Sequence, residues 1–422
     1  MTAGTLQGLT MGLSMTGISA FFKPIAEELN LTRAVASLAG GLSRLGGSFE
    51  APLSGFLVDK FGPRWIMLIG INIFVIGLIL MSRINSTLAY IIAWIIVSTG
   101  VNFAATVAVD KTLTNWFVKK RGLVMGLKSG LIGVFGAAML PIVAWLIVSV
   151  GWRSSFLIWG GIVPAILLPL VWFFVKQQRP EYYGLLPDGA KAESDSTADT
   201  EDMIEKGTQY AADFQETEFT LRQAMKTLAF WLLLVAMVGQ GVATGGFGLH
   251  CIPFLTDQGI SPTMAGALMG MMIFFTIPAR TLAGLIADRL KKTQLQLLWA
   301  AGCLLRALGI GFFLFSQTTV MIYVFLILYG IGTGVVAPLD IIVRGRYFGR
   351  KAYGSIAGSS SMFTAPFGVA APIFTGWVYD TTGNYITALI VFALLFVLTA
   401  ILLFFIRSPK PPANITGIDK FM

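Results

Sequence analysis

Arg280 is a charged residue inside a long apolar run that extends from Met269 to Ala287. An arginine at the centre of a membrane helix costs roughly 2.5 kcal/mol or more. The residues just before it, Phe275 to Ala279, include no acid that could neutralise it. Its guanidinium is always charged, and its planar fork of N–H donors matches a carboxylate. The sequence therefore predicts that Arg280 anchors an anionic substrate in a water-filled cavity.

A second interpretation of Arg280 needs no substrate. Asp288 lies eight residues further along the same run, which is about 12 Å on a helix. Arg280 could extend its long side chain toward the membrane surface beside that carboxylate. We favour the anchor and keep the surface-directed side chain as the alternative.

His250 and Asp257 are the candidates for handling a proton. They are seven residues apart, so two helical turns would place both on one face. His250 is the only histidine of the chain, and an imidazole titrates near neutral pH. If it is buried, the carboxyl of Asp257 would also titrate near neutral pH. An anion that binds Arg280 could release this carboxylate from a contact with Arg280, which would link protonation to substrate binding. The alternatives are a packed histidine and a solvated aspartate, because Asp257-Gln258-Gly259 resembles a turn.

Further charged residues lie within apolar runs, and ion pairs between helices are their simplest explanation. A role in the cavity stays open for Glu50 and Lys111, and Arg306 is interpreted as structural. The set comprises Arg44, Glu50, Asp110, Lys111, Arg306 and Asp340.

The composition indicates the environment that must hold these residues. Of 422 residues, 55% are hydrophobic and only 12% are charged, whereas soluble domains carry about 25% charged residues. The mean hydropathy is +0.77. The net charge of +9 comes from basic residues in short loops, which favours a lipid bilayer over nucleic acid as the partner. One histidine and two cysteines give no support for a metal site, a disulfide framework or a cofactor.

Twelve apolar runs are long enough to cross a bilayer, which takes about 20 residues each. Backbone groups in lipid must bond internally, so an all-α membrane protein with twelve transmembrane helices is predicted. The runs are 3–22, 35–58, 65–82, 87–117, 122–150, 154–175, 226–252, 262–287, 294–315, 319–343, 354–378 and 385–406. They predict a six-helix bundle at 1–175, a mobile linker loop at 176–225, a second bundle at 226–407 and a tail at 408–422.

Basic residues are unequally divided between alternate loops. One set of loops holds twelve, and the other holds four, namely Lys23, Arg33, Arg83 and Arg153. The richer set is expected in the cytoplasm, so both termini and the linker are predicted to be cytoplasmic.

The two halves repeat each other. Gly55-Phe-Leu-Val-Asp59 returns as Gly284-Leu-Ile-Ala-Asp288, with an offset of 229 residues between the two aspartates. Trp116-Phe117 returns as Tyr347-Phe348 with an offset of 231 residues, and Pro141 returns as Pro372 with the same offset. A nearly constant offset indicates two parallel repeats of six helices.

These motifs resemble the major facilitator superfamily. The segment Asp59-Lys60-Phe61-Gly62-Pro63-Arg64 is similar to its signature between helices 2 and 3. The segment from Trp116 to Gly126, with Phe21-Phe22-Lys23-Pro24 and Arg280, is similar to the monocarboxylate transporters and to bacterial oxalate/formate antiporters. The resemblance implies alternating access about a central site.

The resemblance also implies two groups of functional residues. Substrate-binding candidates near mid-depth are Thr16, Asn102, Phe135, Tyr329, Ser360 and Phe363, together with Arg280. Candidates for closing the cytoplasmic side are Asp59, Arg64, Asp288, Arg289, Lys119 and Arg121. The alternative for the basic members of the second group is that they only set the orientation in the membrane.

Three departures from the relatives narrow the prediction. Where animal monocarboxylate transporters carry a helix 1 lysine, seven residues before Lys23, this chain has Thr16. Where they carry an aspartate one turn before the helix 8 arginine, it has Thr276. The antiporters add a helix 11 lysine, whereas residues 354–378 contain no basic residue here. A buried dianion would need about two positive charges, because an unpaired buried charge costs several kcal/mol. The single Arg280 therefore favours a substrate with one carboxylate.

The sequence therefore predicts a transporter of a short monocarboxylate, such as L-lactate or pyruvate, moving with a proton across the plasma (inner) membrane. The alternative is an anion exchanger of the oxalate/formate type without proton coupling. Drug efflux would instead favour an acidic pocket, and no nucleophile or phosphate-binding motif predicts an enzyme. The sequence identifies no accessory protein.

Overall fold

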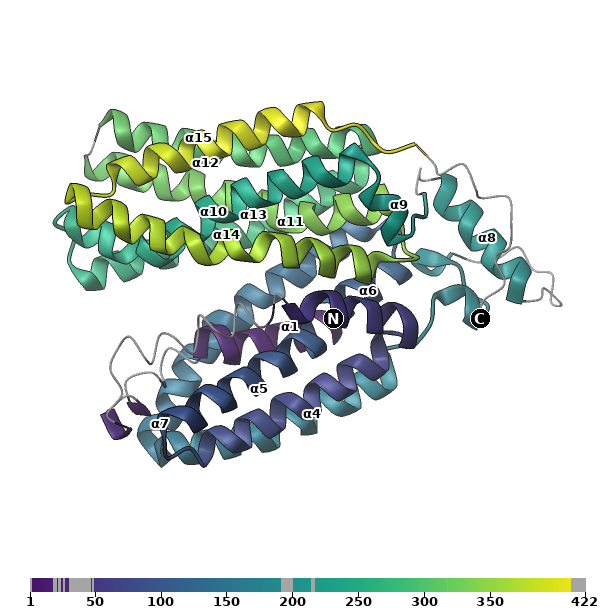
Figure 1. Cartoon of the computed structure of the whole chain (residues 1–422), viewed down its shortest axis with the longest axis horizontal. Coiled ribbons are helices and arrows are strands. Elements are labelled where there is room, and N and C mark those ends of the chain that lie inside the picture. Colours follow the sequence, from purple (N-terminus) through teal and green to yellow (C-terminus); the bar gives the residue numbers. More distant parts are fainter. Residues whose placement is uncertain are drawn as a thin grey trace.

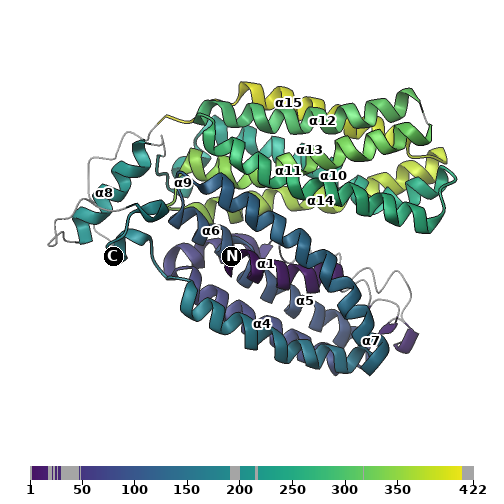
Figure 2. The ribbon, with the colours of Figure 1, turned by 180° about the vertical axis from the view of Figure 1, so that it is seen from behind.

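The computed structural model describes residues 2–17, 21, 24–25, 27–29, 47, 49–190, 200–213, 217–316 and 318–410. Lys23 and Arg44 lie outside these residues, and the side chain of Thr16 is not described. The described chain forms two helical bundles, which are stacked in Figure 1 and seen from behind in Figure 2. Each bundle corresponds to one of the two sequence repeats.

The first bundle contains α1 (Thr2–Met11), the π-helix η1 (Gly12–Gly17) and a helical segment at 49–61. It continues with α4 (Pro63–Ser82), α5 (Thr87–Ala105), α6 (Val107–Trp116) and α7 (Arg121–Phe174). Non-helical angles at Thr106 separate α5 from α6. The run of 54 residues in α7 is two membrane crossings, because Gly151 has φ 81° and breaks it.

The second bundle consists of six helices. They are α10 (Leu228–Asp257), α11 (Pro262–Arg289), α12 (Leu295–Phe315), α13 (Thr319–Phe348), α14 (Tyr353–Thr382) and α15 (Ile386–Phe405). Hydroxyl caps mark several starts: Thr227, Ser261 and Thr318 each accept a backbone N–H of the first turn. Within the described residues, eight stretches are long and apolar enough to cross a membrane, and the one over α7 holds two crossings.

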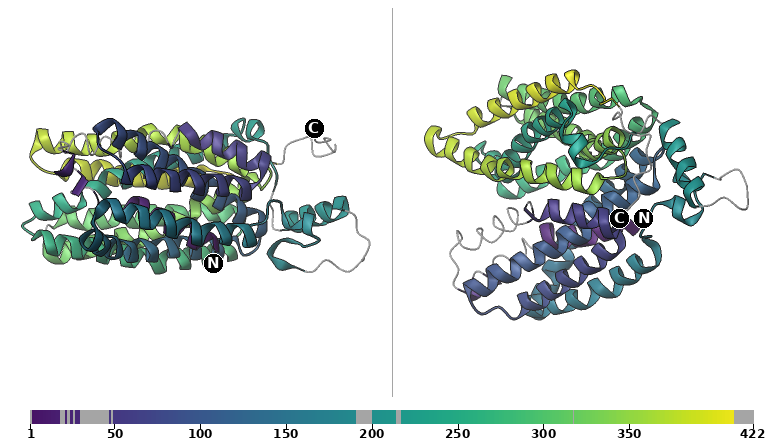
Figure 3. Two further views of the ribbon diagram at one scale, coloured as in Figure 1. Left: turned by 90° about the horizontal axis from the view of Figure 1, so that it is seen from below. Right: turned by 45° about the vertical axis from the view of Figure 1, so that its right-hand side comes forward.

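The linker is more structured than its composition predicts. It contains the 3-10 turns η2 (Pro180–Tyr183) and η3 (Pro187–Gly189), α8 (Thr200–Asp213) and α9 (Leu221–Met225). Figures 1 and 3 show these elements gathered at one end of the molecule, which we call the linker end. The opposite end is called the far end. The two bundles contact each other through α7 with α11 and α6 with α14.

Candidate functional site

Asp59, at the linker end of the first bundle, caps a helix of the second bundle. Its Oδ1 accepts the backbone N–H of Gly354 at 3.1 Å. Its Oδ2 accepts the N–H and the hydroxyl of Ser355, both at 2.7 Å. Gly354 and Ser355 form the first turn of α14, where a carboxylate is stabilised by free N–H groups and the helix dipole. The buried Lys111 completes the contact with its Nζ 2.8 Å from Oδ1.

Asp288 makes the same contact with the bundles exchanged. It lies in the last turn of α11 of the second bundle and accepts the N–H groups of Gly122 at 2.6 Å and Leu123 at 2.7 Å. These two residues form the first turn of α7 in the first bundle. Arg346 lies 3.6 Å from its carboxylate. The repeated aspartates therefore join the two bundles by a pair of reciprocal helix caps.

Glycines allow the helices to come close enough for these caps. A Cβ placed on Gly284 would lie 2.1 Å from the carbonyl oxygen of Gly122. A Cβ on Gly55 would lie equally close, 2.1 Å, to the carbonyl oxygen of Gly354. No side chain fits at such distances, so all four glycines belong to the crossing.

Two of the basic residues predicted to close this end, Arg121 and Arg64, have contacts that the structure describes. Arg121 is fully buried and donates to the carbonyls of Phe117 and Thr114 at 3.0 Å each. The guanidinium of Arg64 stacks 4.2 Å from the Trp172 ring centre. Arg64 and Trp172 belong to the same bundle. The two hydrogen bonds of Arg121 lie within the first bundle, but its guanidinium also reaches the second bundle, where a Cβ added to Gly345 would lie 2.9 Å from Nη1.

Lys119 and Arg289, the other two basic candidates, are exposed at the linker end. The backbone N–H groups of Val118, Lys119 and Lys120 bond the carboxylate of Asp188 at 3.1, 2.8 and 2.9 Å. A linker residue thus holds the loop before α7, and Lys119 contributes to that contact through its main chain.

One ion pair attaches the linker to the second bundle, and another joins two parts of the linker itself. Glu181 pairs with Arg350 at 2.9 Å with both side chains buried, and Glu218 pairs with Arg179 at 2.7 Å. Burial of Glu218 disfavours its charged form, but Arg179 and Arg350 outweigh that effect and lower its pKa. Burial and Asp188 together raise the pKa of the Tyr210 phenol to about 12.

Arg280 lies deeper in the molecule, on α11 at the contact with α7. Its Nη1 donates to the carbonyl oxygen of Ser129 at 3.0 Å, and its buried Nε has no hydrogen-bond partner. Within the described part of the chain, no carboxylate lies within 4.0 Å of it. Ser129 is about 10 Å along α7 from the Asp288 cap. The guanidinium is therefore directed between the bundles, while the Asp288 carboxylate is occupied by other donors.

Asn102 and Phe135, the substrate-binding candidates of the first bundle with described side chains, lie in surroundings different from those of Arg280. The Asn102 amide donates to Glu50 at 3.3 Å, and the Thr99 hydroxyl donates to the same carboxylate at 2.5 Å. Phe135 packs on Gly8, where an added Cβ would meet the ring at 2.6 Å. Glu50 is thus held by neutral donors rather than by a cation in these contacts.

The candidates of the second bundle also lie apart from Arg280. Tyr329 is buried in an aromatic cluster, with ring centres 4.7 Å from Phe247 and 5.8 Å from Phe325. The Ser360 hydroxyl donates to the Ile356 carbonyl of its own helix at 2.8 Å. Phe363 is 39% exposed and packs edge-on to Trp231. None of these described contacts reaches Arg280.

His250 and Asp257 share surroundings at the far end. The neutral imidazole with its proton on Nε2 satisfies both ring contacts, since Nε2 donates to the Pro372 carbonyl at 3.1 Å and Nδ1 accepts from the Tyr385 hydroxyl at 3.3 Å. Asp257 is exposed and lies within hydrogen-bonding reach of Tyr379. Tyr379 and Tyr385 stack at 4.6 Å.

The predicted link between Asp257 and Arg280 is not made in this structure. Arg280 lies 18 residues from Pro262 at the far-end start of α11, a rise of about 27 Å. Asp257 remains near that far end, so a direct ion pair between the two would require a large rearrangement.

Lys128 is an internal charge that the sequence interpretation missed. Its Nζ lies 2.5 Å from Asp110, and its side chain is 4% exposed. The matching pair in the second bundle is Arg344 with Asp340 at 2.7 Å. A lone lysine within the run 122–150 was the available signal, and it is the same kind of signal that identified Arg280.

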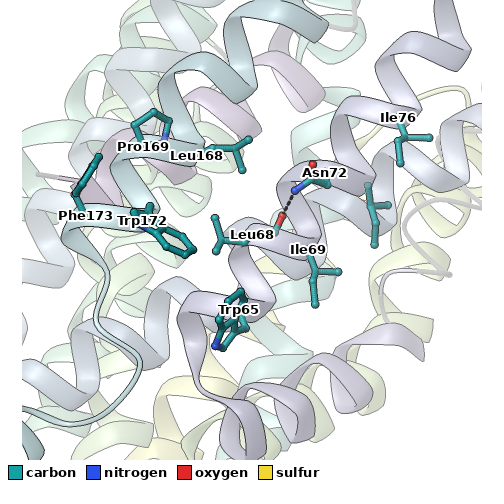
Figure 4. Close-up of a pocket in the computed structure, with 10 residues that line it drawn as sticks. Trp65, Leu68, Ile69, Asn72, Ile76, Leu168, Pro169, Trp172 and Phe173 are labelled. Carbon is teal, nitrogen blue, oxygen red and sulfur yellow. Dashed lines mark hydrogen bonds between the residues drawn. The ribbon is translucent and has the colours of Figure 1, made fainter.

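A groove on the outside of the first bundle offers no place for a carboxylate. It encloses about 710 Å³ between α4 and the end of α7, and apolar side chains line most of it (Figure 4). The Asn72 amide in it donates to the Leu68 carbonyl at 2.8 Å, and the Trp65 indole donates to Gln177 at 3.1 Å. With its polar groups paired, this wall is suited to lipid chains.

Comparisons with known proteins agree with this architecture. The family model described as Major Facilitator Superfamily matches residues 5–370 and 298–421 of this chain. Monocarboxylate transporter 2 of Mus musculus is 23% identical over 87% of this chain and 75% of its own length. The Oxalate:formate antiporter of Oxalobacter formigenes is 22% identical over 64% of this chain and 58% of its own length.

Solved structures share the fold at low identity. The proton:xylose symporter XylE, bound to 6-bromo-6-deoxy-D-glucose, superposes with a TM-score of 0.74 at 15% identity, covering 96% of this chain and 95% of its own. The transporter FucP in the outward conformation gives 0.71 at 14% identity, covering 97% of both chains. The chain therefore belongs to the major facilitator superfamily, and it is a multi-pass membrane transporter with that family's all-helical fold of two six-helix bundles.

Proposed function

We propose that the chain is a secondary transporter that moves a short monocarboxylate, such as L-lactate or pyruvate, together with a proton. The observation that carries the proposal is the guanidinium of Arg280, which faces the other bundle without a described carboxylate partner. Such a charge is costly in a membrane unless an anion compensates it. The named activities of the similar monocarboxylate transporters and the antiporter support a carboxylate as that anion.

Alternating access would proceed by opening and closing the reciprocal caps. With the linker end on the cytoplasmic side, as the basic loops predict, this structure corresponds to a state closed toward the cytoplasm. Substrate on Arg280 would neutralise its charge and lower the cost of closing the other side. Opening would separate Asp59 from α14 and Asp288 from α7.

Proton coupling through Asp257 and His250 is the finer part of the proposal. Both groups lie at the far end, where a proton would enter from outside. Because Arg280 lies about 27 Å along α11 from the far-end start of that helix, protonation would act on the packing of α10 with α14 rather than by direct exchange with substrate.

Uptake of labelled L-lactate into liposomes tests the proposal, with and without an inward proton gradient. Arg280→Gln should lower uptake about a hundredfold, since removing one partner of a desolvated charge pair costs 2–5 kcal/mol or more. Arg280→Lys should restore only part of it, because lysine lacks the fork. Arg83→Gln, an exposed arginine at the end of α4, is the matched control.

Each outcome of these uptake measurements tests a separate part of the proposal. Loss of gradient stimulation in Asp257→Asn with substrate binding intact supports its coupling role. Uptake that ignores the gradient and requires an internal counter-anion would move the function to exchange, the alternative favoured by the antiporter similarity. Wild-type uptake by Arg280→Gln would overturn the anchor.

A further inference from the structure

The apolar groove between α4 and the end of α7 has the length of one membrane leaflet. Ile69 and Phe173, which line its two walls, are 49% and 69% exposed, so the groove is open on the outside of the first bundle. Trp65 and Ile76 lie at opposite ends of its α4 wall (Figure 4). They are eleven residues apart, a rise of about 16 Å. The hydrocarbon core of a bilayer is about 30 Å thick, so this wall matches the chain region of a single leaflet.

The linker end of the groove is where α4 and the end of α7 are tied together by polar bonds. The Trp65 indole donates to the Gln177 side-chain carbonyl at 3.1 Å, and the Gln177 amide donates to the Phe61 carbonyl at 3.1 Å. The Trp65 and Trp172 rings meet edge-on with their centres 6.1 Å apart. Tryptophans favour the level of the lipid headgroups. This end of the groove is therefore expected at headgroup depth.

Arg64 places a positive charge at this same end. Its guanidinium lies 4.2 Å from the ring centre of Trp172, which lines the groove, and the residue is partly exposed. In the described part of the chain, Arg64 has no hydrogen bond and no carboxylate within 4.0 Å. An arginine fork matches a phosphate group, and it remains charged at any physiological pH. Arg64 is thus available to a phosphate at the groove's end.

Two exposed lysines flank this end of the groove. Lys60 directly precedes Phe61, and Lys176 directly precedes Gln177. Each ammonium lies over an aromatic ring, 5.4 Å and 5.6 Å from the ring centres, and neither has a carboxylate within 4.0 Å among the described residues. The neighbouring Asp59 is held by the first turn of α14 and by an ion pair of its own. Three cations at one groove mouth therefore lack a described acidic partner.

We propose that this groove binds an anionic phospholipid. Its phosphate would lie on Arg64 between Lys60 and Lys176, and one acyl chain would follow the wall from Trp65 to Ile76. Basic clusters at a membrane surface attract anionic lipids. A zwitterionic lipid would bring its own ammonium group to the same three cations, so a net negative headgroup is preferred. The site is on the outer wall of the first bundle and is independent of Arg280 and the transported substrate.

Native mass spectrometry of the purified full chain in detergent tests the proposal, with phosphatidylglycerol or phosphatidylcholine added. The chain should retain one phosphatidylglycerol, bound about tenfold more tightly than phosphatidylcholine. Arg64→Gln should weaken phosphatidylglycerol about fivefold and leave phosphatidylcholine unchanged. Arg83→Gln is the matched control, because it removes an exposed arginine from the opposite end of α4. The exposed pair Lys60→Gln with Lys176→Gln should also weaken phosphatidylglycerol about fivefold, without affecting the fold.

Two further measurements separate the chain from the headgroup. Ile69→Trp, which fills the groove from an exposed position, should lower the binding of both lipids. Free glycerol 3-phosphate carries the charge without an acyl chain and should not displace bound phosphatidylglycerol. Unchanged binding in Ile69→Trp, or displacement by glycerol 3-phosphate, would overturn the groove as the chain site. Equal affinity for the two lipids, or equal binding by Arg64→Gln and Arg83→Gln, would overturn the anionic headgroup site.

Discussion

Several charged side chains within the membrane depth form close ion pairs in the described structure, whereas two arginines do not. Asp59 with Lys111, Asp110 with Lys128, and Asp340 with Arg344 form close pairs. Arg280 and Arg306 bond only neutral oxygens and a sulfur in the contacts described. Paired charges support the fold, and the uncompensated charge of Arg280 is the observation behind the proposed anion site.

Lys128→Met should destabilise the protein strongly. It leaves the Asp110 carboxylate buried without its cation, and such a loss costs about 3–5 kcal/mol. Replacing both charges, as Asp110→Asn with Lys128→Met, should recover most of the stability. Thermal unfolding of purified protein in detergent checks both variants. A double variant no more stable than the single one would show that the charge is not the cause.

Close approach of glycine helices determines whether the linker end closes. A Cβ at Gly284 would lie 2.1 Å from the Gly122 carbonyl oxygen, whereas ordinary contact begins near 3.4 Å. Gly284→Ala should therefore separate α11 from α7 by at least about 1 Å and favour a state open at this end. Spin-label distances between Lys60→Cys and Arg289→Cys, in a background of Cys251→Ser and Cys303→Ser, would report the change.

Gly266→Ala is the matched control for that substitution. It changes another glycine of α11, and an added Cβ there has no neighbour within 4 Å. An identical distance distribution in Gly284→Ala and Gly266→Ala would refute the role of the crossing.

The linker contacts should weaken in acid. The pKa of Glu218 is lowered from its ordinary value of 4.5 because Arg179 and Arg350 outweigh the effect of burial. Its stabilising contribution is therefore complete above about pH 4.5 and is lost as the pH falls through the lowered pKa. Hydrogen exchange of the Phe219 N–H, which bonds the Phe348 carbonyl at 3.0 Å, should rise there. Glu218→Gln should show the faster exchange at neutral pH as well.

The sequence predicts the helices well and their partners poorly. Hydropathy and the offset between Asp59 and Asp288 indicate the two bundles. No local signal reveals that Asp59 caps a helix 295 residues away. The linker composition predicts mobility, yet Asp188, Glu181 and Glu218 fold it against distant backbone and arginines. A few long-range bonds outweigh composition there.

Candidate site residues follow the same division. The sequence identifies Arg280 as a candidate because a charge inside a membrane helix is costly. Its hydrogen bond to the Ser129 carbonyl could be found only in the structure. Arg306 is predicted to be structural from its place in an outer helix, and its bonds to Thr244 and Gln240 required the structure. Tyr329 lies in the aromatic cluster, and only side-chain packing reveals that.

Orientation of the whole molecule can be tested with two single cysteines in the same cysteine-free background. Asp202→Cys lies on α8 at the linker end, and Asp380→Cys lies at the far end, both on exposed residues. An impermeant maleimide added to intact cells should label only Asp380→Cys, and permeabilised cells should show both. The reverse pattern would place the linker outside the cell and contradict the distribution of basic loops.

The reciprocal caps have a consequence for the hydration of the transport cycle. Lys111 donates to the main-chain carbonyls of Arg350 and Lys351, and the Asp59 and Asp288 carboxylates accept backbone N–H groups of the opposite bundle. When the linker end opens, every one of these donors and acceptors must be taken over by water. Opening therefore increases the number of bound waters, and large solutes that cannot enter the widened space will oppose it. Turnover should accordingly slow as the osmotic pressure on that side rises.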